Sequence, residues 1–391
     1  MIVEWSKRFF VLCLSTALMA CGTVDTVSGW FEDETYVAPP AELVEFSQEF
    51  KPTVAWTVNT GDGASEYSDL GAWLQGNMIV AIDNEGDLSS YDQITGRQLW
   101  QVELDVPVTT GVGGGDGLIL VGTQEGEVLA LNEANGDLLW RKRLSSEILV
   151  PPKASNNVVV ARSADGRLTG LSVSDGAVLW NYQRAVPLLS LRGTGAPVLA
   201  DDKVIAGYAN GKLVAVSIVD GKVIWEKSIS VPRGRTELDR IVDIDSAPVI
   251  KDGNVYVVAY HGNVAAVSLD SGRTLWSREA SSRSGLDVSV GEAVYLSDDS
   301  DYVWAFQDGT GDALWRQTRL LRRKISAPTI VGENVLVGDF EGYAHWISRK
   351  DGRFVARLQV ADSAIRSQPV VKDDLVYITA VDGTLTALRI Q

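Results

Sequence analysis

The stretch DGKVIW, residues 220–225, places a tryptophan four residues after a turn glycine, and repetition of this pairing decides the fold. The pairing occurs at Gly96/Trp100, Gly136/Trp140, Gly176/Trp180, Gly221/Trp225, Gly272/Trp276 and Gly311/Trp315. Gly352 starts a further copy, with Ala356 in the tryptophan position. If Trp56 is included, successive tryptophans are 44, 40, 40, 45, 51 and 39 residues apart. This spacing is the length of a four-stranded propeller blade.

Each unit has the same internal order of short strands and turns. In the unit that ends at Trp276, the strands are expected at residues 246–250, 254–260, 263–269 and 273–279. Turn residues separate them at 251–253, 261–262 and 270–272. The turn between the second and third strands returns along the chain, so that eight hairpins are predicted. The fold class is therefore all-β: an eight-bladed β-propeller with four antiparallel strands per blade.

The two ends of the repeat complete each other. Residues 384–390 form a third strand after which the sequence stops, and residues 54–59 form a tryptophan-bearing strand with no hairpin before it. Placing the N-terminal strand beside the three C-terminal strands completes the eighth blade and closes the ring, which removes free sheet edges. The tryptophans are expected to pack between neighbouring blades, where each would bury roughly 150–250 Å².

The N-terminus has the features of an export signal. Lys7 and Arg8 precede an apolar run too short to span a bilayer. The run Leu18-Met19-Ala20-Cys21 resembles a bacterial lipobox, which implies a signal peptide at 1–20 and lipid on Cys21. An ordinary signal peptide cleaved nearby is the alternative. Because Gly22 rather than aspartate follows the cysteine, the resemblance to sorted lipoproteins implies the periplasmic side of the outer membrane.

The remaining chain divides into two parts. Residues 21–52 are predicted to be a lipidated tether, with a short amphipathic helix considered at 41–50, and residues 53–391 form the propeller. The net charge of −16 disfavours a nucleic-acid partner, whose phosphates would be repelled.

The sequence offers little catalytic chemistry. The two histidines, His261 and His345, have no partner at metal-ligand spacing, and His261 occupies a turn position. With so few histidines, no nucleophile–base–orienter set is expected among the serines. The glycine-rich residues 111–117 lack the Lys-Ser/Thr of a phosphate loop. We therefore predict no catalytic residue, no metal site and no cofactor.

Function is instead expected where the chain departs from the minimal repeat. The two longest intervals are adjacent, and their extra residues fall in the connections 181–197 and 230–248, which should share one face of the ring. The first connection contains Leu189, Leu191 and Arg192, an apolar anchor beside a charge that suits protein binding. The second contributes Asp243 and Asp245. The alternative is that the leucines point inward beneath a loop that packs on itself.

A third connection, residues 316–328, places five basic residues on the same face: Arg316, Arg319, Arg322, Arg323 and Lys324. In an acidic chain, this cluster is expected to make one face basic. A solvated charge run is the alternative interpretation.

Two family resemblances follow from these motifs. The repeats AVSLDSGRTLW (266–276) and AFQDGTGDALW (305–315) resemble those of pyrroloquinoline-quinone (PQQ) dehydrogenases, but the vicinal cysteines and long inserted loops of that family are missing. The lipobox, the propeller, LLSLRG (188–193) and RIVDIDSAP (240–248) together resemble the BamB family of the β-barrel assembly (BAM) machinery. The second resemblance implies a non-enzymatic periplasmic scaffold that binds the POTRA domains of BamA, associates with other BAM subunits and supports insertion of β-barrel proteins into the outer membrane.

The BamB resemblance also implies roles for individual residues. Leu189, Leu191 and Arg192 would contact the partner, and Asp243 and Asp245 would orient the loops or Arg192. Two alternatives remain open: a PQQ-dependent enzyme, and a receptor that binds unfolded outer-membrane proteins directly by β-augmentation.

Overall fold

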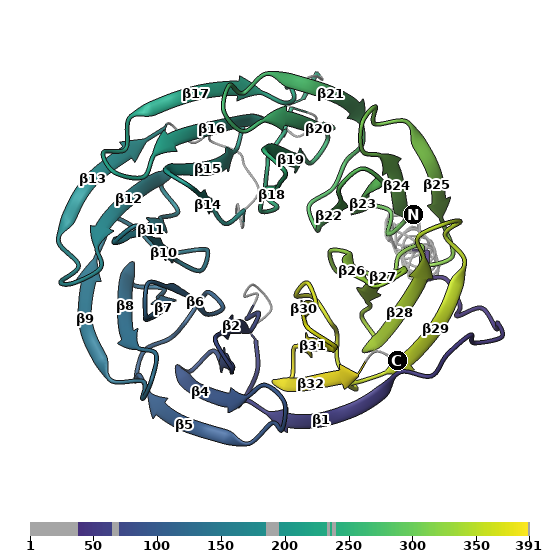
Figure 1. The fold of residues 1–391 in the computed structure, drawn as a ribbon, viewed down its shortest axis with the longest axis horizontal. Helices are drawn as coiled ribbons and strands as arrows, with labels where there is room; N and C mark the ends of the chain where they lie inside the picture. Colours follow the sequence, from purple (N-terminus) through teal and green to yellow (C-terminus); the bar gives the residue numbers. More distant parts are fainter. Residues whose placement is uncertain (1–37, 65–69, 185–194, 233–234, 237–239, 390–391) are drawn as a thin grey trace, which may run out of the picture. The chain divides into compact units, whose positions relative to one another are not determined.

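The computed structural model describes residues 38–64, 70–184, 195–232, 235–236 and 240–389. The chain divides into two compact units, Met1–Pro40 and Ala41–Gln391. The second unit contains eight four-stranded antiparallel sheets arranged around a central axis (Figure 1). The described residues form no helix, and so none that could cross a membrane. The predicted all-β, eight-bladed propeller is confirmed.

Seven blades are continuous in sequence, and each runs from its innermost to its outermost strand. In chain order their strands are β2 (Trp73–Gln75), β3 (Met78–Ile82), β4 (Asp87–Asp92), β5 (Gln98–Glu103); β6 (Gly113–Gly115), β7 (Leu118–Gly122), β8 (Glu127–Asn132), β9 (Leu138–Arg143); β10 (Lys153–Ser155), β11 (Val158–Arg162), β12 (Arg167–Ser172), β13 (Val178–Gln183); β14 (Val198–Ala200), β15 (Lys203–Tyr208), β16 (Lys212–Ser217), β17 (Val223–Ser228); β18 (Val249–Lys251), β19 (Asn254–Val258), β20 (Asn263–Ser268), β21 (Thr274–Glu279); β22 (Gly285–Ser289), β23 (Ala293–Ser297), β24 (Val303–Gln307), β25 (Ala313–Gln317); and β26 (Thr329–Val331), β27 (Asn334–Gly338), β28 (Tyr343–Ser348), β29 (Phe354–Gln359).

The eighth blade joins the two ends of the chain. Its order is β30 (Val370–Lys372), β31 (Leu375–Thr379), β32 (Thr384–Arg389) and β1 (Thr53–Asn59). The register runs from Thr53 opposite Arg389 to Asn59 opposite Thr384. The predicted closure of the ring by the N-terminal strand is therefore confirmed.

Burial along the strands explains the residue types that the repeat uses. The second strand of a blade is covered on both faces by neighbouring blades, and every residue of β7 and β11 is buried. Such strands need a continuous apolar run rather than alternation. In the outermost strands β9, β13 and β17, the third residue, which is the tryptophan, is buried among mostly exposed neighbours.

The glycine and the tryptophan of one repeat serve different blade contacts. Trp180 lies against Gly221 of the next blade, where a Cβ atom would stand 2.7 Å from the indole ring. The φ of Gly221 is +69°, a conformation that also favours glycine. The Trp180 Nε1–H donates to the carbonyl oxygen of Ile218 at 2.7 Å. The predicted packing of tryptophan between blades is thus confirmed, and it accounts for the recurring glycine.

The missing tryptophan at Ala356 coincides with the seam of the ring. The outermost strand of the next blade is β1, which comes from the N-terminal part of the chain. No turn glycine precedes it. Instead, Phe50 packs edge-on against Trp346, with ring centroids 6.1 Å apart, and joins the core cluster that contains Ala356. The segment before β1 therefore fills space beside blade 7 that a tryptophan fills elsewhere.

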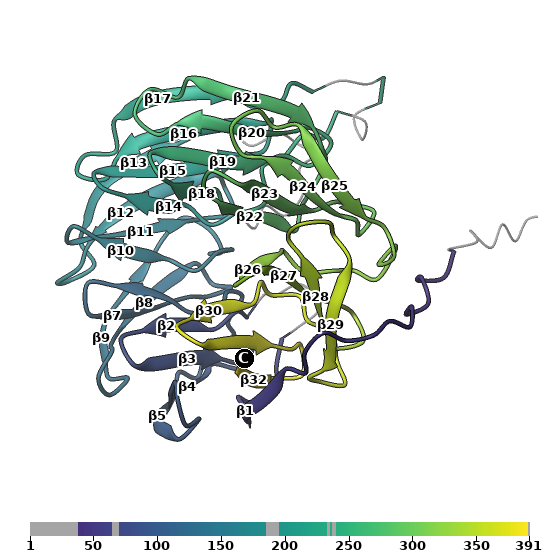
Figure 2. The ribbon, with the colours of Figure 1, turned by 45° about the vertical axis from the view of Figure 1, so that its right-hand side comes forward.

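Residues 41–50 are extended along blade 7 rather than helical, so the helix considered for them is wrong. Phe46 stacks on Phe354 at a centroid distance of 5.5 Å, and the backbone N–H of Glu49 donates to the carbonyl of Val355 at 2.8 Å. Figure 2 shows the segment in purple, passing the outer strand β29 before it enters β1. We call residues 41–50 the strap.

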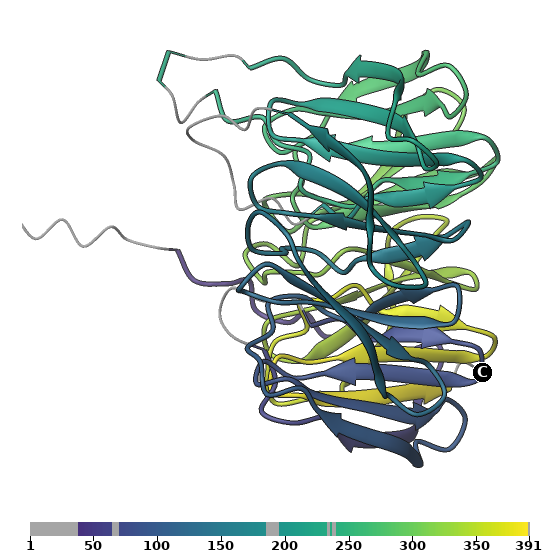
Figure 3. The same ribbon diagram turned by 90° about the vertical axis from the view of Figure 1, so that its left-hand side faces the viewer.

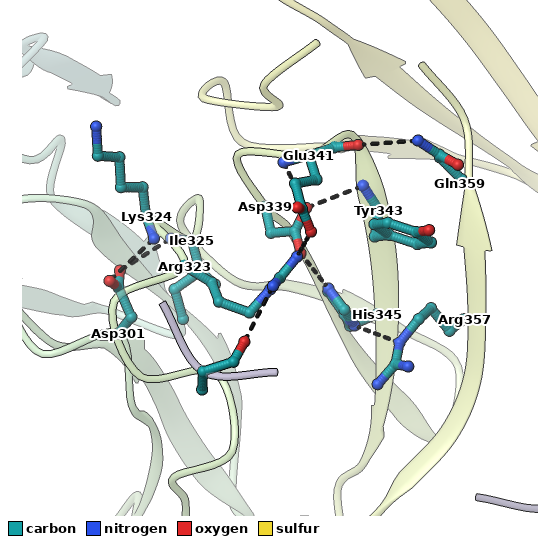
Figure 4. A network of polar contacts seen from close by, with 12 residues as sticks. Asp301, Arg323, Lys324, Ile325, Asp339, Glu341, Tyr343, His345, Arg357 and Gln359 are labelled. Carbon is teal, nitrogen blue, oxygen red and sulfur yellow. Dashed lines mark hydrogen bonds and ion pairs between the residues drawn. The ribbon is translucent and has the colours of Figure 1, made fainter. Parts of the chain in front are cut away.

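A buried polar network in blade 7 holds the strap (Figure 4). Asp339 is fully buried and accepts hydrogen bonds from Arg323 Nε and His345 Nε2, both at 2.8 Å. Arg357 Nε donates to His345 Nδ1 at 3.1 Å, so that this imidazole is neutral and carries its proton on Nε2. Burial lowers the pKa of His345, in agreement with the neutral form.

The same arginines reach strap carbonyls. Arg323 Nη1 donates to Ala41 O, and Arg357 Nη1 donates to Val44 O, each at 3.1 Å. The strap is thus fixed by its backbone as well as by its aromatic side chains.

Candidate functional site

The two longest connections between blades lie around blades 3, 4 and 5. The first joins β13 to β14 and the second joins β17 to β18. In the second, the carbonyl of Val242 accepts a hydrogen bond at 2.9 Å from the N–H of Asn210, which lies in the β15–β16 turn. The β17–β18 connection therefore lies on the face that carries the turns between second and third strands, as predicted. Seen edge-on in Figure 3, the described part of this connection (teal) extends beyond the ends of the blades.

Only two of the predicted partner-binding residues can be placed. Leu189, Leu191 and Arg192 lie outside the described residues, as does the predicted lipidation site Cys21. Asp243 and Asp245 are described, and their exposed fractions are 1% and 6%. These two carboxylates are therefore buried beneath the face and do not form its surface.

Residues 242–246 are held deep between blades 4 and 5. Val242 and Ile244 belong to the core cluster shared by these blades. A Cβ atom on Gly207 would stand 2.2 Å from the Ile244 side chain, so the close approach of β15 to this segment requires glycine. The backbone carbonyl of Asp243 accepts a hydrogen bond from the backbone N–H of Tyr260 at 2.8 Å. The end of the second loop is thereby fixed to blades on both sides.

Arg162 anchors the end of the first loop. Its Nη1 donates to the carbonyl of Gly195 at 2.8 Å, and its guanidinium lies 5.0 Å from the centre of the Tyr208 ring. Gly195 also lies against the backbone of Ile244 and Asp245. A buried arginine at the end of β11 therefore connects the two loops.

Arg162 is not among the site residues predicted above, although the repeat contains a signal for it. Arg162 is the fourth residue before its turn glycine. The same position in the other seven repeats is apolar, small or an uncharged hydroxyl residue: Ile82, Gly122, Gly207, Val258, Ser297, Gly338 and Thr379. A charge at a position that the repeat otherwise keeps neutral indicates a local function.

The electrostatics of this cluster are unusual for surface loops. Burial, together with the neighbouring Asp243, raises the pKa of Asp245 to about 7, and Arg162 and Arg283 oppose the shift. Burial lowers the pKa of Arg162, while Tyr208 and the two aspartates act in the opposite direction. We call Arg162, Tyr208, Asp243 and Asp245 the loop anchor.

The raised pKa of Asp245 predicts a pH-dependent stability. Between about pH 4 and pH 7 the carboxyl is ionised in the unfolded chain but protonated in the folded one, so its contribution falls as pH rises and is fully lost above pH 7. We expect Asp245→Asn to become more stable relative to the parent between pH 5 and pH 8, by about 2 kcal/mol. Urea unfolding at several pH values measures this difference.

Asp374 provides the control for this prediction, because it is exposed. Asp374→Asn makes the same substitution at the surface, and its difference from the parent is the baseline for Asp245→Asn at pH 5 and pH 8. An Asp245→Asn variant whose difference from the parent does not change between pH 5 and pH 8 would show that Asp245 is ionised throughout this range in the folded protein.

The basic connection between β25 and β26 does not form one solvated patch. Arg323 is buried, with 3% of its surface exposed, and pairs with Asp339 and Glu341. Arg316 lies over the ring of Trp304, 4.7 Å from its centre. The expected cluster of five exposed basic side chains is therefore wrong for Arg323, which is internal, whereas Arg316, Arg319, Arg322 and Lys324 are exposed.

The described residues offer no arrangement for metal chemistry. They contain no group of three or more His, Cys, Asp or Glu side chains placed to hold a metal ion. His261 is an exposed turn residue with φ of +49°, as expected from its position in the repeat.

Comparisons with known proteins identify close relatives. The family model described as "Outer membrane protein assembly factor BamB" matches residues 84–317 and 305–391. A protein of that name from Pseudomonas aeruginosa is 45% identical over 391 residues, covering 100% of both chains. The crystal structure of BamB from Moraxella catarrhalis superposes with a TM-score of 0.80 at 27% identity, covering 87% of this chain and 100% of the other.

The enzymes with this architecture are distant. Quinohemoprotein alcohol dehydrogenase from Comamonas testosteroni matches with a TM-score of 0.67 but only 12% identity, over 86% of this chain and 76% of the enzyme. Similarity at this level shows the shared propeller fold alone.

Proposed function

The chain belongs to the BamB family of outer membrane protein assembly factors, and from this premise we propose that it is a periplasmic scaffold that binds the POTRA domains of BamA. Its role is in outer membrane protein assembly, within the BAM complex. It is not an enzyme, since its close relatives are named as assembly factors and the dehydrogenases are only distant neighbours.

The loop anchor is the observation that carries this proposal. It fixes the ends of two neighbouring long loops to a rigid ring: Arg162 binds Gly195, and the segment around Asp243 is bonded to blades 4 and 5. Loops held at their bases by a rigid scaffold suit partner binding, because less conformational entropy is lost on association.

We assign the contacts with BamA to the first loop. Leu189 and Leu191 supply apolar anchors for a POTRA domain, and Arg192 supplies a directional charge. Asp243 and Asp245 act from below, by positioning the loops. Binding in this way would restrict the hinge motions of BamA and hold it in a form competent for barrel insertion.

Membrane attachment is a separate part of the proposal. Lipid on Cys21 would hold the protein at the periplasmic side of the outer membrane, because several acyl chains together give durable anchoring.

Loss of BamA binding tests the proposal. We expect the folded variant Leu189→Ala/Arg192→Ala to bind purified BamA at least 30-fold more weakly than the parent, which corresponds to about 2 kcal/mol. Titration calorimetry measures the affinity, and circular dichroism verifies folding. Co-purification from detergent-solubilised envelopes provides the measurement in the native complex.

A matched pair on the opposite face supplies the control. Val219 and Lys222 lie in the turn between β16 and β17. Val219 is 69% exposed, and the side chain of Lys222 is 82% exposed. Val219→Ala/Lys222→Ala also removes an apolar side chain and a cation, and should bind BamA normally. Undiminished binding by the loop variant would remove the loop from the mechanism, and crosslinking to unfolded barrels without BamA would favour the direct receptor.

A further inference from the structure

A cavity of about 390 Å³ lies at the hub of the ring. Its walls come from the innermost strands and from the segments that enter them. All eight blades contribute, so only the closed ring builds this site. The volume suits a small organic molecule rather than a few water molecules.

The charge of the wall is opposite to that of the protein. The chain carries a net charge of −16, yet the cavity is lined by Lys153, Arg283 and Arg366 against one acid, Asp245. The pKa of about 7 leaves Asp245 partly protonated at neutral pH. The hub is therefore a local concentration of positive charge in an acidic molecule.

Lys153 is the distinctive residue of the wall. It is the first residue of β10 and faces Val160 of β11. The residues in the same register of six other innermost strands are uncharged: Trp73, Gly113, Val198, Val249, Thr329 and Val370. In the seventh, β22, Asp287 occupies this register, so Lys153 is the one basic residue at this position among the eight innermost strands that the structure describes.

The ammonium group of Lys153 has no acceptor or carboxylate partner among the described residues, whereas Lys251 pairs with Asp287 at 2.9 Å. Burial alone lowers the pKa of Lys153. An ammonium group that is partly removed from water without an acceptor is destabilising, and an anion beside it would remove that penalty.

The other walls suit an organic molecule. Trp73, Val112, Leu149 and Val370 line the cavity with apolar surface. The remaining lining carries charged, hydroxyl and amide side chains, so the cavity offers surfaces for both an apolar part and an anionic group of one molecule.

We propose that the hub cavity binds a small organic acid, with its carboxylate beside Lys153 and its apolar part against these walls. This inference goes beyond the scaffold role: the cavity lies at the axis of the ring and shares Asp245 with the loop anchor. It involves no chemical step: the site binds the acid and does not transform it.

Titration with benzene-1,3-dicarboxylate tests the proposal, with the uncharged benzene-1,3-dicarboxamide as the matched probe. We expect saturable one-to-one binding of the dicarboxylate by calorimetry, and at least tenfold weaker binding by Lys153→Met. Binding should also raise the pKa of the Lys153 ammonium, measured by NMR. Inorganic phosphate should bind more weakly than the dicarboxylate, because it has no apolar part.

The controls separate this site from folding and from the partner interface. Lys222→Met removes an exposed cation on the other face and should leave the dicarboxylate affinity unchanged. Lys153→Met should fold and bind BamA like the parent. Three results would each overturn the proposal: no saturable binding, equal binding of the dicarboxamide, or an affinity that Lys153→Met leaves intact. Tighter binding of phosphate than of the dicarboxylate would overturn the assignment to an organic acid.

Discussion

Asp339→Ala is expected to lower the free energy of unfolding by about 3–5 kcal/mol, because it leaves buried partners without their counter-charge. Asp339 is fully buried, and Arg323 is 3% exposed. Besides Arg323 and His345, the carboxylate accepts hydrogen bonds from the backbone N–H groups of Glu341 and Tyr343 at 3.0 Å. Alanine would remove all four interactions, and urea unfolding measures the loss.

The polar network also predicts which segment loosens first when Asp339 is replaced. Arg323 and Arg357 both bind carbonyls of the strap, so cleavage by a protease within residues 41–50 should accelerate before the ring unfolds. Glu341→Ala is the control, because this partner of Arg323 has a half-exposed side chain and should contribute less than about 1 kcal/mol. A destabilisation by Asp339→Ala no greater than that of Glu341→Ala would show that the network does not stabilise blade 7.

Trp180→Ala should destabilise the ring by about 3–5 kcal/mol, through lost apolar contact and the cavity left between blades 3 and 4. The indole is 6% exposed and is bonded to Ile218 O at 2.7 Å. The adjacent Leu179 is 51% exposed, and Leu179→Ala should change the stability by less than about 0.5 kcal/mol. Equal effects of the two substitutions in urea unfolding would contradict a structural role for the tryptophan.

The architecture could be predicted from the sequence because the residue types that each turn and blade contact needs recur in successive repeats. Gly221 and Trp180 form one contact, and six further copies of that contact use the same two residue types. The seam was predictable for the same reason, since the strand at 54–59 had no hairpin before it and the strand at 384–390 had no fourth strand after it.

The side chains around the candidate face could not be placed from the pattern alone. Asp243 and Asp245 are acidic residues in a long loop, a context that usually indicates exposure, but their burial depends on contacts with blades 4 and 5. Arg323 belongs to a basic run, and only its tertiary pairing with Asp339 distinguishes it from its exposed neighbours. Arg162 is different: its position within the repeat could have revealed it.

The strap shows how one pattern fits two structures. The alternation of apolar and polar residues over 41–50 is compatible with an amphipathic helix, yet the segment is extended. Its backbone bonds go to Arg323, Arg357 and Val355 rather than to itself. Tertiary partners therefore decided its conformation, which local propensity cannot predict.

Closure of the ring by β1 and β32 has a consequence for biosynthesis. Thr57 and Thr386 share a hydrogen bond at 3.2 Å although 329 residues separate them. β1 therefore leaves the ribosome long before its partner β32, and until β32 has been made β1 is an unpaired strand that can associate wrongly. Closing so long a loop is slow. A nascent chain that stops short of residue 384 leaves a gap in the circle, so the eighth blade can cover its neighbours fully only after residues 384–389 have been made.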